Sequence, residues 1–172
     1  MPQLDSFATE DLVLLPPAIV EAIEAAPISG LDDGPPVPAL FGLLSDGMES
    51  QWASIGSAQK SLCMSGLWLL AGELDRSHSI SQNIESAEGS FWHGIMHRRE
   101  GDFGNSKYWF RRVGSHPVFE QLAEISEGVY TDPYDFVDRC SRVKRSDDAS
   151  FQQCQRAQWL EWQALMAHCL RM

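Results

Sequence analysis

Lysine and arginine are absent from residues 1–59, which contain nine Asp and Glu residues. The whole chain of 172 residues carries a formal net charge of −11. Duplex nucleic acids are bound largely through cations that neutralise phosphates, so this composition excludes nucleic acid as an expected partner. Residues 98–112 show the opposite bias, with five basic and two acidic side chains. We expect the two regions to attract each other within one chain or across a dimer.

Long apolar runs are also absent, as is the basic and then apolar start of a secretion signal. We therefore expect no membrane association and a cytoplasmic location. The four cysteines include no C-x-x-C pair, which indicates reduced, buried thiols and argues against a cysteine-based zinc site. The chain has no glycine-rich phosphate loop, no H-E-x-x-H motif and no Ser/His/Asp arrangement typical of a nucleophilic hydrolase.

Apolar residues at three- and four-residue spacing dominate the chain after about Ser57, and strand-like alternation is nearly absent. This pattern predicts an all-α protein. A short helix is expected at 17–25, before a Gly- and Pro-rich loop at 27–38. The later helices are expected at 58–72, 74–83, 88–100, 104–113, 117–126, 133–145 and 150–170.

The length fits a single domain, 1–172, with three parts. Residues 1–56 form an acidic, loop-rich N-terminal segment, and 57–126 form a core of antiparallel helical hairpins. Residues 127–172 form C-terminal helices, the last of which has an apolar side that suits a cap over the hairpins. The same side, if exposed, would serve as a homodimer interface.

An internal repeat joins residues 69–81 to 98–110, with Gly72 aligned to Gly101 and Ser77 to Ser106. Each copy reads as a helix that ends at a glycine, a tight turn, and a second helix with a small residue near its start. The segment Ser90–Pro117 resembles a tetratricopeptide repeat. The resemblance rests on residues at the family's glycine, small-residue, aromatic and terminal proline spacings, namely Gly94, Gly101, Ser106, Phe110 and Pro117, the proline lying one residue early.

The tetratricopeptide resemblance implies antiparallel hairpins that stack side by side. The chain departs from the family at His93 and His97, where an aromatic residue and a leucine normally face the partner helix. The longer segment 92–119 also resembles a family of small helical proteins from bacteria and fungi whose function is uncharacterised, so this second resemblance implies no activity.

The segment WHGIMHRREGD (92–102) contains the strongest candidate site. At about 100° per residue, His93, His97 and Glu100 fall within an arc of about 60° on one helix. Folding the helix at 74–83 back against this one brings Asp75 and His78 toward the same face. Two imidazoles four residues apart, together with carboxylates from a facing helix, form a ligand set that suits zinc or iron. The predicted metal ligands are therefore Asp75, His78, His93, His97 and Glu100.

Two other interpretations of this face remain open. The histidines and their charged neighbours could form an ordinary solvated surface, or the histidines could be buried in structural hydrogen bonds with Glu100 and Asp75. A small acidic ligand beside a metal would need cations to hold it, and Arg98, Lys107 and Arg111 are the candidates. The alternative for Arg98, Lys107 and Arg111 is pairing with nearby carboxylates.

Two functions follow from these possibilities. In the first, a His/carboxylate pocket between two helices binds a divalent metal or a small anionic ligand, with or without catalysis. In the second, the protein is a tetratricopeptide-like interaction module that binds a partner protein, and the polar cluster is purely structural.

Overall fold

The computed structural model describes residues 4–45, 52, 55–143 and 148–172 of the chain. These residues form ten α-helices and contain no β-strand, which confirms the all-α prediction. The helices are α1 (Ser6–Leu12), α2 (Pro17–Ala25), α3 (Pro38–Ser45), α4 (Ser57–Leu70), α5 (Leu74–Ser81), α6 (Ala87–Arg99), α7 (Phe103–Val113), α8 (Pro117–Ile125), α9 (Pro133–Arg142) and α10 (Asp148–Arg171).

The eight expected helices all exist, with bounds within three residues of the prediction. The expected last two residues of the helix at 133–145 lie outside the described residues. Two short helices, α1 and α3, were not expected, and they make the N-terminal segment more ordered than its Gly and Pro content suggested. The bounds of α2, α8 and α9 follow from a proline in the first turn of each, where its missing N–H has no partner to lose.

The repeat detected in the sequence is also a repeat of local geometry. Gly72 and Gly101 end their helices with φ of +83° and +86°, a left-handed conformation that glycine adopts without strain. The Ser77 hydroxyl lies 3.1 Å from the Ser65 hydroxyl, and the Ser106 hydroxyl donates to the Gly94 carbonyl at 2.7 Å. Both contacts join residues twelve positions apart, so small buried serines bring α5 onto α4 and α7 onto α6 in the same way.

The core lies where α6 packs against α4, α7 and α10. Phe91, Trp92 and Ile95 of α6 are fully buried. A Cβ atom added to Gly66 on α4 would lie 2.6 Å from the Trp92 ring, so only glycine allows α4 to pass this close. Trp162 of α10 donates its indole N–H to the Gly66 carbonyl at 2.7 Å, which fixes α10 at the same point.

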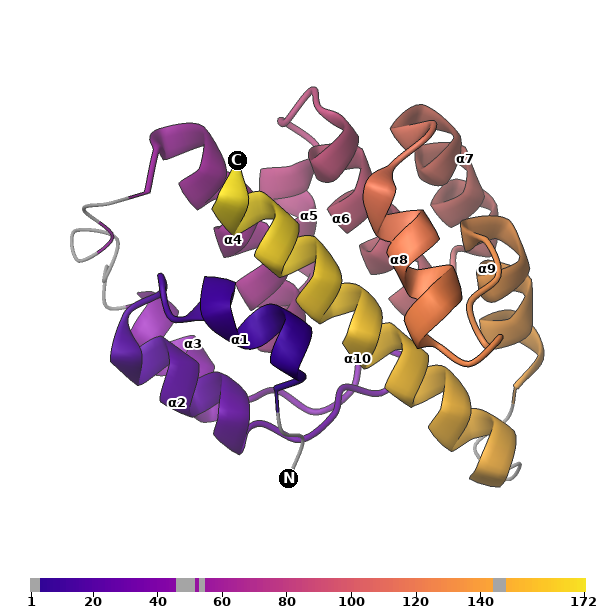
Figure 1. Ribbon diagram of the computed structural model, residues 1–172, viewed down its shortest axis with the longest axis horizontal. Helices are drawn as coiled ribbons and strands as arrows, with labels where there is room; N and C mark the ends of the chain where they lie inside the picture. The colour runs from indigo at the N-terminus through magenta and orange to yellow at the C-terminus, as the bar shows by residue number, and fades with distance from the viewer. Residues whose placement is uncertain (1–3, 46–51, 53–54, 144–147) are drawn as a thin grey trace.

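Helix α10 runs diagonally across the face of the molecule shown in Figure 1 and contacts α1, α4, α8 and α9. Two ion pairs attach α1 to it, Asp5–Arg156 and Asp11–Arg171, each at 2.5 Å. The acidic N-terminal segment therefore pairs with basic residues of α10 within one chain. None of the described helices is long and apolar enough to cross a bilayer.

The segment before α3 is attached to α6 by one buried cation. Arg99 donates to the backbone carbonyls of Asp32, Asp33 and Leu69 at 3.0, 2.9 and 2.5 Å. The dipoles of these three carbonyl groups therefore hold the guanidinium in place. Burial, and then the charge of the neighbouring Arg98, lower the pKa of Arg99 to about 10. The connection from α2 to α3 is thus part of the packed structure around the C-terminal end of α6.

Candidate functional site

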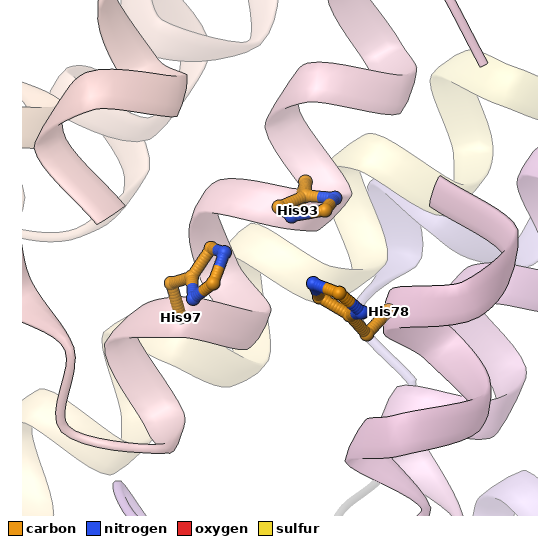
Figure 2. Close-up of side chains that lie close together, drawn as sticks. All are labelled: His78, His93 and His97. Carbon is orange, nitrogen blue, oxygen red and sulfur yellow. The ribbon is translucent and has the colours of Figure 1, made fainter. Parts of the chain in front are cut away.

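Three histidines converge between α5 and α6. Figure 2 shows His78 on α5 facing His93 and His97, which lie one turn apart on α6. The ring centroids are 4.6 Å apart for His78 and His93, 5.5 Å for His78 and His97, and 4.7 Å for His93 and His97. One ring nitrogen from each residue lies within 4.8 Å of the other two. The facing arrangement of the two helices brings together histidines that are up to 19 residues apart in sequence.

Two of the three rings have a hydrogen-bond partner at Nδ1. The Nδ1 atom of His93 lies 3.0 Å from the Ser81 hydroxyl, and Nδ1 of His97 lies 2.5 Å from Oε1 of Glu100. The Glu100 carboxylate accepts from Nδ1–H of His97, and the Ser81 hydroxyl, which donates to the His78 carbonyl, accepts from Nδ1–H of His93, so both rings keep the lone pair of Nε2. A histidine that binds metal through Nε2 normally has its Nδ1 hydrogen-bonded in this way.

His93 is the most constrained member of the cluster. Its side chain is buried, and the Trp109 ring of α7 packs on it with centroids 4.0 Å apart and an interplanar angle of 33°. Burial, and then repulsion from His97 and His78, lower the pKa of His93 to about 3. The ring is therefore neutral at physiological pH, which is the protonation state that a metal ligand requires.

The two predicted carboxylate ligands lie at different distances from this cluster. Glu100 contacts His97 directly but forms its own close group with His97 and Asp102, apart from His78 and His93. Asp75 is exposed at the start of α5 and belongs to no close group of potential ligands among the described residues. The structure thus brings together His78, His93 and His97. Glu100 contacts only His97 of these three, and Asp75 is not part of the cluster.

A cavity of about 630 Å³ borders the C-terminal end of α6. Asp75, Arg98 and Glu100 line it, whereas the three histidines do not. Its acidic lining residues outnumber its basic ones, since they comprise Asp32, Asp33, Glu73, Asp75 and Glu100 against Arg98 and Arg99. The charge of this lining favours a cation more than an anion.

The three cations predicted to hold an anionic ligand have separate environments. Arg98 is buried against α10, where it donates to the Glu161 carboxylate and to the Gln158 side-chain oxygen and stacks over Phe136. Lys107 forms an ion pair with Asp138 of α9 at 2.6 Å. Arg111 is exposed near the end of α7. Arg98 and Lys107 therefore have carboxylate partners inside the chain, but these lie on other helices and are not the neighbouring carboxylates that the pairing interpretation expected.

Sequence reasoning missed a second cluster of potential ligands. Glu88 of α6, His116 at the start of α8 and His168 of α10 place one ligand atom each within 4.8 Å of the others. All five histidines of the chain therefore lie in one or the other of the two clusters. Glu88, His116 and His168 share no local motif. The only signal in the sequence was that the chain of 172 residues has few histidines, so that each of them was a candidate ligand.

No family model, no curated protein and no solved structure matches the chain. The two resemblances noted in the sequence therefore stay predictions.

Proposed function

We propose that the protein binds a divalent transition metal, zinc in preference to iron, between α5 and α6. The ligands are the Nε2 atoms of His93 and His97 and one ring nitrogen of His78. The observation that supports this most strongly is the convergence of three imidazoles, two of which have Nδ1 already occupied by Ser81 and Glu100. Three histidines with no carboxylate among them favour zinc, whereas iron sites usually combine imidazole with carboxylate.

Ligand nitrogens around a tetrahedral zinc ion, with bonds of 2.0–2.1 Å, lie about 3.3 Å apart. The three nitrogens here lie within 4.8 Å of one another, so small ring movements would bring them to this spacing. His78 supplies most of this movement, because its side chain is half-buried while His93 is packed under Trp109. Three protein ligands leave the fourth position for water, whose pKa zinc lowers, so the site can support hydrolytic chemistry.

Metal binding is supported better than binding of a small acidic ligand. Arg98 and Lys107 are committed to Glu161 and Asp138, and the cavity next to Glu100 has an acidic lining. Asp75 and Glu100, which the sequence predicted as metal ligands, do not bind the metal in this proposal. Glu100 acts instead by orienting His97, and Asp75 has no role in the metal site.

We also propose that α4–α5 and α6–α7 are stacked hairpins of the tetratricopeptide type, with α10 as their cap. The matching glycine turns and serine contacts of the two hairpins support this. The alternative function, a groove for a partner protein, stays a prediction, as do the cytoplasmic location, the possible homodimer and the absence of a nucleic-acid partner.

Metal content tests the proposed function. The protein is purified from cells grown with added zinc or iron and passed over a chelating resin, and its metal is quantified by mass spectrometry. We expect retained zinc in the wild type and its loss from this site in His93→Asn and His97→Asn, while circular dichroism shows both variants folded. Asp75→Asn is the matched control and keeps the wild-type content. Equal zinc in the wild type and in both folded histidine variants would contradict the proposal.

A further inference from the structure

The cluster of Glu88, His116 and His168 has the composition and the spacing of a second metal site. Its members come from three helices that are distant in sequence: the first turn of α6, the residue before α8, and the last turn of α10. The His116 side chain is 3% exposed, that of Glu88 13% and that of His168 25%, so the site is enclosed at one side and reaches solvent at His168.

The distances within the cluster are too long for good hydrogen bonds. Oε1 of Glu88 lies 3.5 Å from Nε2 of His116 and 3.4 Å from Nε2 of His168. Nε2 of His116 is buried and has no hydrogen-bond partner among the described residues. Ligand atoms that share a tetrahedral ion with bonds of 2.0–2.1 Å lie about 3.4 Å apart. The observed distances, which are also within ion-pair range, equal the separation expected of ligands around one ion.

The protonation states also suit a metal. Burial, and then the neighbouring His168, lower the pKa of His116, while Glu88 acts in the opposite direction. Burial alone would raise the pKa of Glu88, but hydrogen bonds from its own backbone N–H and from Ser86, with the charge of His116, lower it overall. At neutral pH the cluster thus contains a carboxylate and a neutral imidazole, and the imidazole can coordinate through Nε2 once its proton has moved to Nδ1.

We propose that Glu88, His116 and His168 bind a second divalent metal ion, independently of the three-histidine site. The donors are Oε1 of Glu88 and the Nε2 atoms of the two histidines, a set of two imidazoles and one carboxylate that suits zinc or iron(II). The ion ties the start of α6 and the start of α8 to the end of α10. It takes no part in the chemistry available between α5 and α6.

Metal binding here has a consequence at the start of α8. Nδ1 of His116 accepts a hydrogen bond from the Val118 N–H at 3.3 Å, so the proton of the neutral ring is on Nε2. When Nε2 binds an ion, the ring proton moves to Nδ1 and the Val118 N–H loses its acceptor. The Val118 amide is therefore a direct reporter of occupancy.

Zinc titration of the metal-free full-length protein, in competition with a chromophoric chelator, tests the second site. We expect two equivalents for the wild type and one for His168→Gln and for Glu88→Gln. Glu85→Gln is the matched control, since Glu85 is an exposed carboxylate three residues away, and it keeps two. In amide NMR spectra, the Val118 resonance shifts on zinc addition to the wild type and to His93→Asn, but not to His168→Gln.

Two equivalents in folded His168→Gln, or a Val118 resonance that never moves with zinc, would overturn the second site. If His168→Gln and Glu88→Gln both fail to fold, the response of the Val118 resonance to zinc in the wild-type protein tests the second site. The three-histidine site is tested separately. Its assignment is contradicted if His93→Asn binds as many equivalents of zinc as the wild type.

Discussion

Nδ1 of His97 lies 2.5 Å from Oε1 of Glu100, the residue that caps the C-terminal end of α6. The carboxylate fixes the orientation of the imidazole, increases its basicity and leaves Nε2 as the nitrogen available to a metal. Partners of this kind commonly change metal affinity without changing the number of ions bound.

Glu100→Gln is therefore expected to weaken zinc binding by about 10–100-fold and to leave the stoichiometry unchanged. Chelator competition measures the affinity. Asp75→Asn is the matched control, because Asp75 is also exposed but contacts none of the three histidines, and its zinc affinity stays at the wild-type value. Equal affinities for the two variants would show that Glu100 does not orient the ligand.

The low pKa of His93 predicts acid sensitivity of the metal-free protein. The folded-state value is about 3 and the ordinary value is 6.5. Between these values the unfolded chain takes up a proton that the folded chain excludes, so the free energy of unfolding falls as the pH decreases from 6.5 toward 3. The full loss from this residue is on the order of 4–5 kcal/mol.

Urea unfolding at pH 7.0, 6.0, 5.0 and 4.5 measures this dependence. His93→Asn removes the titrating group, so its stability is expected to fall less steeply over the same range. Carboxylates such as Glu88 contribute equally to both proteins, and the difference between the two slopes isolates His93. Parallel slopes would mean that His93 titrates as it does in an unfolded chain.

The buried pair of Arg98 and Glu161 predicts a strong and asymmetric response to mutation. Both side chains are 0% exposed. Arg98→Met leaves the carboxylate buried without its partner and is expected to destabilise the protein by about 3–5 kcal/mol. The double variant Arg98→Met, Glu161→Leu removes both charges and recovers most of that loss. Denaturant unfolding of the two variants checks this, and a double variant no more stable than the single one would contradict it.

The two equivalent turn glycines predict different costs for the same substitution. Gly101→Ala places a Cβ in open space, so only the positive φ opposes it, at about 1–2 kcal/mol. Gly72→Ala has the same backbone strain and also brings the Cβ to 3.0 Å from the Pro35 carbonyl oxygen. Thermal unfolding should therefore show a larger loss for Gly72→Ala, and equal losses would indicate that residues 35–36 move away freely.

Much of the helical architecture could be predicted because it depends on local patterns. Apolar spacing, first-turn prolines and helix-ending glycines specified eight helices and the repeat. Helices α1 and α3, of seven and eight residues, are too short to show a helical period clearly, and they lack the repeat that marked the equally short α5. The burial of Arg99 could not be predicted either, since it depends on where the long connection at 31–36 crosses α6.

Only the part of the candidate site that depends on the pairing of α5 with α6 could be predicted from the sequence. Three of the five proposed metal ligands do converge, because residues on facing sides of α5 and α6 must meet once the chain reverses near Ser86. The register between the two helices was not readable, so Ser81 occupies the place beside His93 and Asp75 is at the solvent-exposed end. The second cluster depends on how α8 and α10 pack on α6, which no local pattern encodes.

X-ray absorption of zinc-loaded His168→Gln tests the central proposal most directly, because in this variant only the three-histidine site should be occupied. We expect a first shell at about 2.0–2.1 Å with the multiple scattering of three imidazoles and one oxygen ligand. A folded protein that retains no zinc, or a shell of oxygen atoms without imidazole scattering, would contradict the assignment of His78, His93 and His97 as metal ligands.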